Sequence, residues 1–143
     1  MNAVSADGAW IAGNAETPAG SRAFRWSLST GPVDLGTFPS GTLSVANGIS
    51  GDGSTVVGTG IGLVGIRPFR WTEALGMEDL GRLSTDATHN FAYAASRDGT
   101  VVVGESENRA FRWTQGGGME NLGTLSEFSG SSARSVSGSG QVV

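Results

Sequence analysis

Short apolar runs separated by glycine-rich turns follow one another along the whole chain, and apolar and polar positions alternate within each run. In the middle of the chain these runs cover 45–50, 55–59, 67–72 and 77–80. Alternation with a period of two, bounded by Gly, Asp and Ser, is typical of half-buried β-strands. No segment keeps the 3.6-residue apolar period of a helix. The pattern therefore predicts four short antiparallel strands and essentially no helix.

This four-strand pattern is repeated. The third strand of each unit carries nearly the same five residues, Arg22-Ala-Phe-Arg-Trp26, Arg67-Pro-Phe-Arg-Trp71 and Arg109-Ala-Phe-Arg-Trp113, and Asp-Leu-Gly or Asn-Leu-Gly follows each. Units of about 40 to 45 residues with four strands are typical of β-propeller blades. We predict an all-β fold, in one repeat-array domain over 1–143, made of propeller blades. The predicted blades cover residues of about 2–36, 44–81 and 91–123, and the first two strands of a fourth blade cover 133–143.

A second motif precedes the first in every unit. Its copies are Ser5-Ala-Asp-Gly8, Ser50-Gly-Asp-Gly53, Ser96-Arg-Asp-Gly99 and Ser137-Gly-Ser-Gly140. Asp-Gly between two strand-forming runs predicts a tight hairpin turn, because Gly and Asp tolerate the positive φ that such turns need. A calcium site needs six or more oxygen ligands, whereas each turn offers a single carboxylate. We expect a structural role for these carboxylates and neither a metal nor a cofactor. The aspartates concerned are Asp7, Asp52 and Asp98.

The repeated aromatic residues are the predicted core. Alternation along 67–72 puts Phe69 and Trp71 on one face of the strand and Pro68 and Arg70 on the other. An aromatic side chain buries about 150 to 250 Å², so we expect the aromatic pairs to pack between neighbouring blades. These structural pairs are Phe24 with Trp26, Phe69 with Trp71, and Phe111 with Trp113. The arginines between them are expected to pair with the fourth strand. The expected pairs are Arg25 with Asp34, Arg70 with Asp79, and Arg112 with Asn121.

The repeat count bears on association. Propellers typically close with four to eight blades, so three units and a fraction leave two faces uncovered. We expect either a longer array or self-association of copies through the open blade ends, for example two chains that pool their blades into one ring.

Composition removes several classes of partner. The formal net charge is −4 and no run of Lys or Arg occurs, so neither nucleic acid nor an anionic membrane is an expected partner. The chain has no cysteine, which excludes a disulfide framework and a thiolate metal site. No apolar stretch approaches the roughly 20 residues that span a bilayer. The first eight residues resemble the middle of a repeat rather than a signal peptide.

The repeated residues resemble the HAF family of extracellular repeats, found in bacterial surface and autotransporter-type proteins. The resemblance covers almost the whole chain and is carried, in the third unit, by Asp98-Gly-Thr-Val-Val-Val-Gly104, Ala110-Phe-Arg-Trp113 and Asn121-Leu-Gly-Thr-Leu125. An arginine replaces the first His of the family pattern in every unit, and Pro68 replaces Ala in one unit. The resemblance implies a repeat fold and a secreted or cell-surface location, and it implies no activity.

Ligand-binding residues are expected where the units differ. In a four-stranded meander, the loops between the second and third strands and the loops between units share one edge of the sheets, and these loops vary in length and chemistry. Constant strands with variable loops are how scaffolds carry recognition, although drift of unconstrained loops explains the same variation. The candidate ligand-binding residues at this edge are Glu16, Thr17, His89, Asn90, Glu107 and Asn108.

The expected function is a non-enzymatic β-propeller repeat module that binds protein or glycan through this loop edge. His89 is the only histidine, and the acids Glu16, Glu105 and Glu107 lie in connections, where scattered surface carboxylates are the simpler interpretation. We therefore expect no catalytic residue. Two alternatives remain open, namely a segment of a carbohydrate-active propeller enzyme and a purely structural spacer.

Overall fold

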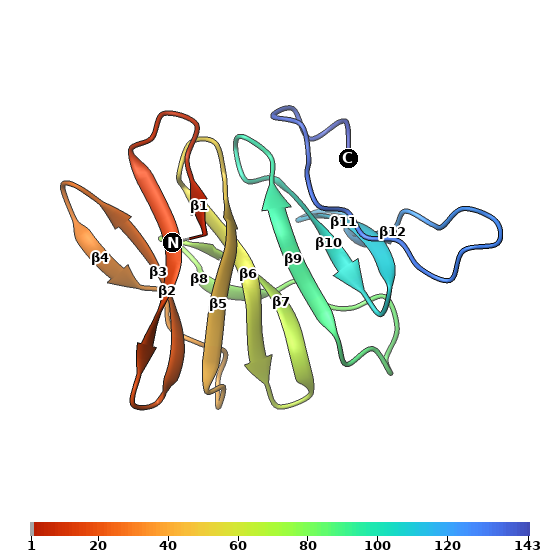
Figure 1. Cartoon of the computed structure of the whole chain (residues 1–143), viewed down its shortest axis with the longest axis horizontal. Coiled ribbons are helices and arrows are strands. Elements are labelled where there is room, and N and C mark those ends of the chain that lie inside the picture. The colour runs from red at the N-terminus through yellow and green to blue at the C-terminus, as the bar shows by residue number, and fades with distance from the viewer. Residues whose placement is uncertain (1) are drawn as a thin grey trace.

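The computed structural model describes residues 2–143, which form three antiparallel sheets of four strands each and no helix (Figure 1). The first sheet contains β1 (Ala3–Val4), β2 (Trp10–Thr17), β3 (Gly20–Ser27) and β4 (Gly31–Asp34). The second contains β5 (Leu43–Ile49), β6 (Thr55–Gly62), β7 (Gly65–Thr72) and β8 (Gly76–Asp79). The third contains β9 (Asn90–Ala95), β10 (Val101–Ser106), β11 (Arg109–Thr114) and β12 (Gly118–Asn121). The predicted all-β fold of four-stranded units is confirmed.

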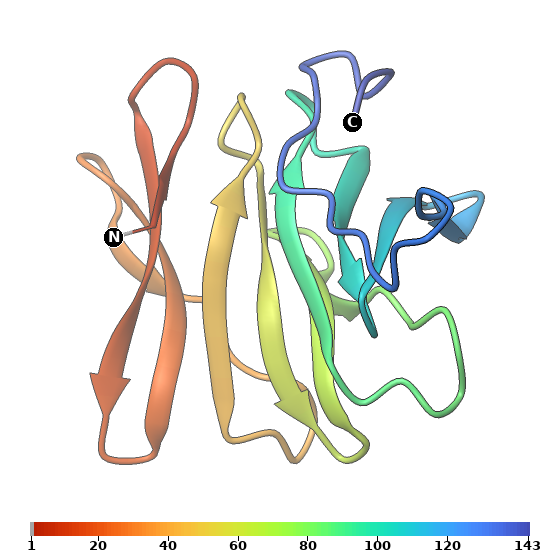
Figure 2. The ribbon, with the colours of Figure 1, turned by 45° about the vertical axis from the view of Figure 1, so that its right-hand side comes forward.

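The three sheets stand side by side in chain order, and the C-terminal segment lies against the third (Figure 2). Strands follow their sequence order within each sheet, so that β1, β5 and β9 form one margin of the three sheets, where β5 adjoins both β1 and β9. Gly48 of β5 is a point of close approach between these inner strands, because a Cβ there would lie 2.5 Å from the carbonyl oxygen of Tyr93 in β9. The inner strands of neighbouring sheets therefore tolerate only small residues where they meet.

The repeated aromatic pairs fill the junctions between sheets. Phe69 is fully buried and Trp71 is 7% exposed, in a cluster with Ala12 and Ala23 of the first sheet. Phe111 and Trp113 occupy the same place one sheet later, in a cluster that contains Val57 of the second sheet. Each Phe-Arg-Trp strand thus packs its aromatic face against the preceding sheet.

The first sheet departs from this rule. Phe24 and Trp26 lie on the face of β3 that points away from the second sheet, and both are only half-buried. The opposite face of β3, with Ala23 and Arg25, is the buried one. We call the side of the first sheet that bears Phe24 and Trp26 its outer face. No sheet lies beside it (Figure 2).

The expected partners of the middle arginines are wrong, although one of these arginines does pair with the fourth strand. Arg70 forms an ion pair at 2.8 Å with Glu78, its cross-strand neighbour in β8, and not with Asp79. Arg25 forms an ion pair at 3.0 Å with Glu73 of the second unit. Both also reach the hairpin turn of the next unit, where Arg25 donates to the carbonyl oxygen of Gly53 at 3.3 Å and Arg70 to that of Gly99 at 3.1 Å. Arg112 reaches the carbonyl oxygen of Gly140 at 3.4 Å. The guanidinium groups of the first two also lie over the tryptophans of the next sheet, Arg25 at 4.9 Å from the Trp71 ring and Arg70 at 5.9 Å from that of Trp113. These arginines therefore bridge consecutive sheets.

The side chains at the end of each fourth strand form hydrogen bonds within their own turn. Asp34, Asp79 and Asn121 each accept a hydrogen bond at 2.8 Å from the backbone N–H of the glycine two residues later. Such side-chain turns reverse the chain after each fourth strand. In the second unit the first arginine of the motif, Arg67, forms the ion pair with Asp79, at 2.8 Å.

The hairpin turns form a second bridge. The backbone N–H of Asp52 donates to the carbonyl oxygen of Arg97 at 2.9 Å, and the N–H of Arg97 donates to that of Gly138 at 3.1 Å. Gly53 has a φ of 75° and lies against Trp10, where a Cβ would be 2.2 Å from the indole. Glycine is needed there both for its backbone conformation and for the close approach.

Residues 133–143 depart from the expected pair of strands. The fourth copy of the turn does form, with hydrogen bonds from Gly140 N to Ser137 O at 2.9 Å and from Ser137 N to Val142 O at 2.8 Å. However, no strand is assigned between residues 122 and 143.

The junction packing leads to a comparison of equivalent phenylalanines. We expect Phe69→Ala to lower the free energy of unfolding by about 3 to 5 kcal/mol, because it leaves a cavity between two sheets. Phe24→Ala, at the same position of the half-buried outer face, should cost about 1 kcal/mol in dilute solution, since little apolar area is newly exposed. Urea unfolding followed by tryptophan fluorescence measures both. Equal losses would contradict the packing described for the two faces.

Candidate functional site

The Ser-x-Asp-Gly turns have a complete internal set of partners. In the second unit the Ser50 hydroxyl donates to the Asp52 carboxylate at 2.6 Å and accepts the backbone N–H of Thr55 at 2.9 Å. The same carboxylate oxygen accepts the N–H of Ser54 at 2.9 Å. The first and third turns repeat this geometry with Asp7 and Asp98. Residues 2–143 contain no group of three or more His, Cys, Asp or Glu side chains that could hold a metal ion.

These hydrogen bonds keep the aspartates ionised. The hydroxyls of Ser5 and Ser96, together with backbone N–H groups, lower the pKa of Asp7 and of Asp98 below the ordinary value of 3.8. Partial burial raises the pKa of Asp52, but the hydrogen bonds from Ser50 and Ser54 outweigh it and the pKa is lowered. The negative charge is therefore part of each turn.

The candidate ligand-binding residues of the loop edge do not form one site. Glu16 and Thr17 lie at the end of β2 in the first sheet, where the Thr17 hydroxyl donates to the carbonyl oxygen of Gly20 at 2.7 Å. His89, Glu107 and Asn108 lie together at one corner of the third sheet. The structure thus separates the first pair from the rest by the width of the second sheet (Figure 1).

The corner at His89 is rigidly built. One carboxylate oxygen of Glu107 accepts the backbone N–H of Thr88 at 2.6 Å and that of His89 at 3.0 Å. The imidazole Nδ1 lies 3.6 Å from the same oxygen. The bond from the Thr88 N–H, followed by that from His89, lowers the pKa of Glu107. Glu107 therefore fixes the loop that precedes β9, while the side chain of His89 remains 65% exposed.

Asn90 does not belong to the exposed set. Its side chain is fully buried, donates to the carbonyl oxygen of Ile66 at 2.9 Å and accepts the Ser106 hydroxyl at 2.6 Å. In the other two junctions the equivalent residue is a serine, Ser44 or Ser131, whose hydroxyl accepts the backbone N–H of the alanine in the preceding third strand. Pro68 stands at that alanine position in the second unit and has no N–H to donate. Asn90 thus replaces a serine where the partner donor is missing.

An aromatic surface on β9 was not predicted from the sequence. The Phe91 and Tyr93 rings are stacked with an interplanar angle of 5° and a centroid distance of 6.1 Å. The guanidinium carbon of Arg134 lies 4.1 Å from the Tyr93 ring centroid. Phe91 and Tyr93 are half-buried and Arg134 is exposed, so all three present part of their surface to solvent.

A β-bulge places Tyr93 on this surface. The register of β9 and β10 shifts so that Ala92 and Ala94 pair with consecutive residues and Tyr93 is the extra one. The same bulge in β5 falls at Asn47, whose side chain donates to the carbonyl oxygen of Ala92 at 2.9 Å. A bulge redirects a side chain. One repeat position thus joins two sheets in the second unit and displays an aromatic ring in the third.

Charged and hollowed surface adjoins these rings. Burial raises the pKa of the Tyr93 phenol and the Glu105 carboxylate adds to this, which keeps the phenol a hydrogen-bond donor. Glu105 lies opposite Phe91 in the ladder and, with Asn108 and residues 129–132, lines a hollow of about 440 Å³. We call the surface formed by Phe91, Tyr93, Glu105 and Arg134 the β9 surface. His89 directly precedes β9 and adjoins this surface at the start of the strand.

The sequence did contain a signal for the β9 surface. The bulge position reads Asn2, Asn47, Tyr93 and Arg134 in successive units, while the positions around it remain small. Variation at one position between small neighbours is the same kind of signal that singled out the loops.

The structure matches TolB structures of two bacteria. TolB from Acinetobacter baumannii superposes with a TM-score of 0.64 at 19% identity over 90% of this chain and 33% of that protein. Putative TolB from Agrobacterium tumefaciens gives 0.60 at 20% identity over 85% of this chain and 44% of that protein. The chain thus spans between a third and a half of the TolB chains it matches. No family model and no curated protein matches the sequence. At these identities the likeness shows the fold alone, which is that of the β-propeller.

No helix that could cross a bilayer is found in the part of the chain that the structure describes.

The Asp turns predict acid sensitivity. The folded-state pKa values of Asp7, Asp52 and Asp98 are lowered below the ordinary value of 3.8. The stability that these groups contribute is therefore fully present above pH 3.8 and is lost as the pH falls through the folded-state pKa values. Urea unfolding from about pH 6 down to about pH 2 should therefore show a falling free energy of unfolding below about pH 4. Asp98→Asn should flatten the fall, whereas Asp86→Asn in an exposed loop should leave it unchanged. An unchanged profile for Asp98→Asn would refute this role.

The Pro68 and Asn90 pair predicts energetic coupling. Pro68→Ala introduces a buried N–H without an acceptor, which should cost about 1 to 3 kcal/mol. Asn90→Ser alone removes the hydrogen bond to Ile66. The double variant recreates the serine-to-N–H bond of the other junctions, so its loss should be smaller than the sum of the single losses by about 1 kcal/mol. A double-mutant cycle in urea measures this difference, and additive losses would contradict the account of Asn90.

Proposed function

We propose that this chain is a non-enzymatic β-propeller repeat module that binds another macromolecule through the β9 surface and the adjoining His89 corner. The observation that carries the proposal is the stacked Phe91, Tyr93 and Arg134 ladder, which lies at solvent, unlike the aromatic residues that fill the two sheet junctions. Tyr and Arg are enriched among residues that dominate binding energy. Tyr supplies rigid apolar area and a hydroxyl at a low entropic cost, and Arg supplies a planar group of hydrogen-bond donors.

The residues around the ladder hold its side chains in place before a partner binds, which favours a role in binding. The Glu107 carboxylate fixes the loop before β9, and the bulge fixes the direction of Tyr93, so little order has to be imposed when a partner docks. The carboxylate of Glu105 and the donors of Arg134 and Tyr93 offer polar groups of both kinds around the rings. A peptide segment with an apolar or aromatic side chain suits this arrangement, and so does the apolar face of a sugar ring.

The HAF-like pattern of the sequence supports a secreted or cell-surface location for the module. The same pattern supports a repeat scaffold in which the strands recur in every unit and individual surface positions differ between units. Membership of that family is part of this proposal.

A carbohydrate-active enzyme is the competing function. A glycosidase needs one carboxyl group whose pKa is raised so that it can act as a general acid. The backbone hydrogen bonds to Glu107 lower its pKa, which suits a structural anion and not a general acid. Chromogenic glycosides measure this directly, and hydrolysis abolished by Glu105→Gln would overturn the non-enzymatic proposal.

The binding proposal is tested by selection and substitution. The labelled chain is applied to a glycan array and used as bait for a random-peptide display library. We expect binders whose affinity falls about tenfold or more in Tyr93→Ala and in Arg134→Ala, as for interface anchors. Phe128→Ala, at an exposed aromatic residue outside the β9 surface, is the matched control and should bind normally. The absence of binders from both sources, or binders insensitive to Tyr93→Ala, would count against the β9 surface.

A further inference from the structure

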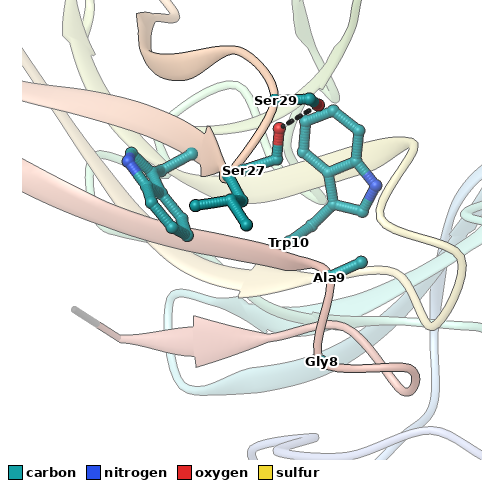
Figure 3. A pocket seen from close by; sticks show the side chains of 7 residues that line it. Gly8, Ala9, Trp10, Ser27 and Ser29 are labelled. Carbon is teal, nitrogen blue, oxygen red and sulfur yellow. Dashed lines mark hydrogen bonds between the residues drawn. The ribbon is translucent and has the colours of Figure 1, made fainter.

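The outer face of the first sheet carries the aromatic pair without the cover that the other sheets provide. Phe69 and Phe111 are fully buried, whereas Phe24 and Trp26 are half-buried. At one margin of this face Trp10, Trp26 and Leu28 line a hollow of about 590 Å³, and Leu28 is 90% exposed. Figure 3 shows the Trp10 indole at this hollow beside the hydrogen-bonded Ser27 and Ser29.

The opposite end of the molecule carries a matching cavity. Phe69 packs in one cluster with Ala12, Ala23, Leu35 and Ala46. The equivalent positions of the next repeat surround Phe111. One repeat later again, the equivalent positions are Val103, Ala110, Leu122 and Ala133.

No phenylalanine fills this third set in the part of the chain that the structure describes. Instead, Ala110, Leu122 and Ala133 line a cavity of about 600 Å³. Leu122 is 42% exposed, whereas its equivalents Leu35 and Leu80 are 4% exposed. The C-terminal face, as we name this end, is therefore shaped like the acceptor half of the two internal junctions.

The middle arginine of the third unit, Arg112, also lacks the aromatic partner that its equivalents have. Arg25 and Arg70 each bond a glycine carbonyl of the next turn and lie over a tryptophan of the next sheet. Arg112 bonds the equivalent carbonyl, that of Gly140, and lies over no aromatic ring in residues 2–143. A hollow of about 530 Å³ adjoins Arg112 and Trp113. The C-terminal face thus has the cavity at Ala110 and Leu122 and the guanidinium group of Arg112, both of which could receive a Phe-Arg-Trp strand.

We propose that a second copy of this chain docks head to tail, with its outer face on the C-terminal face of the first copy. Phe24 of the incoming copy enters the cavity at Ala110 and Leu122, and its Trp26 lies under Arg112. The interface repeats the junction that the chain already forms twice between its own sheets, which is why we favour a second copy over an unrelated protein. Docking and ligand binding at the β9 surface would compete, because Arg134 belongs both to that surface and to the segment at the C-terminal face.

Docking has a consequence for the C-terminal segment. Ala133 and Val136 pack against Val101, Val103 and Ala94 of the third sheet. In the internal junctions this inner half of the face is covered by the first two strands of the following sheet. The β1 and β2 strands of the incoming copy therefore displace residues 134–143 when they dock. This displacement also removes the Gly140 carbonyl from Arg112 and Arg134 from the Tyr93 ring.

The test uses the full chain and two blocking variants. Sedimentation analysis should show the 14.5 kDa chain in concentration-dependent oligomers. Trp26→Glu blocks the outer face and Leu122→Arg blocks the C-terminal face, so each variant alone should stay monomeric. A heterologous contact leaves one good face on each variant, and an equimolar mixture should therefore form a dimer that cannot extend. Leu63→Arg, at an 84% exposed leucine in another turn, is the matched control and should associate as the wild type does.

Other outcomes overturn the proposal. A wild-type monomer at millimolar concentration excludes the contact. A dimer abolished by Trp26→Glu alone, with Leu122→Arg unaffected, would show two outer faces in contact instead. Hydrogen exchange of residues 134–142 should accelerate on association, and unchanged exchange there would place the second copy elsewhere. Circular dichroism of each variant, compared with the wild type, distinguishes a blocked face from a misfolded chain.

Discussion

Each Phe-Arg-Trp strand of this chain needs a neighbouring sheet on the side of its phenylalanine and tryptophan. A four-stranded sheet of this size cannot bury two aromatic rings within itself, because every strand lies in the same layer. The preceding sheet must therefore present small residues, such as Ala12 and Ala23, opposite the rings. The arginine between the rings points the other way and bonds the following sheet. One strand thus serves two junctions, and the stability of each sheet depends on its neighbours.

The sequence was sufficient for the contacts that lie within one unit. The strands, the Asp-Gly turns and the structural role of Asp7, Asp52 and Asp98 follow from residues that are close together in the chain. The carbonyl partners of Arg25 and Arg70 could not be predicted in this way, because Gly53 and Gly99 lie 28 and 29 residues away, in the next unit. Alignment of the units with one another hides such contacts, since both partners recur with the same period.

The candidate site was predictable only in part. The corner formed by His89, Glu107 and Asn108 was identified from loop variation, and the structure brings these residues together. Glu16 and Thr17 lie in another sheet, because loops of successive units are separated by the full width of a sheet. Tyr93 was not among the candidate residues, because these were chosen from the variable loops and a bulge within a strand was not predicted.

The exchange of Ala for Pro68, matched by Asn90, has a consequence for a chain made of near copies. Repeats with almost identical strands can assemble in the wrong order, because any Phe-Arg-Trp face fits any alanine-lined neighbour. A third sheet placed on the first would set Asn90 against the N–H of Ala23, and a second sheet placed on itself would set Ser44 against a proline. Either error changes the hydrogen bonding that the correct pair of sheets makes at this position. This single pair of substitutions therefore favours the native order of the sheets over an order in which a sheet packs on the wrong neighbour.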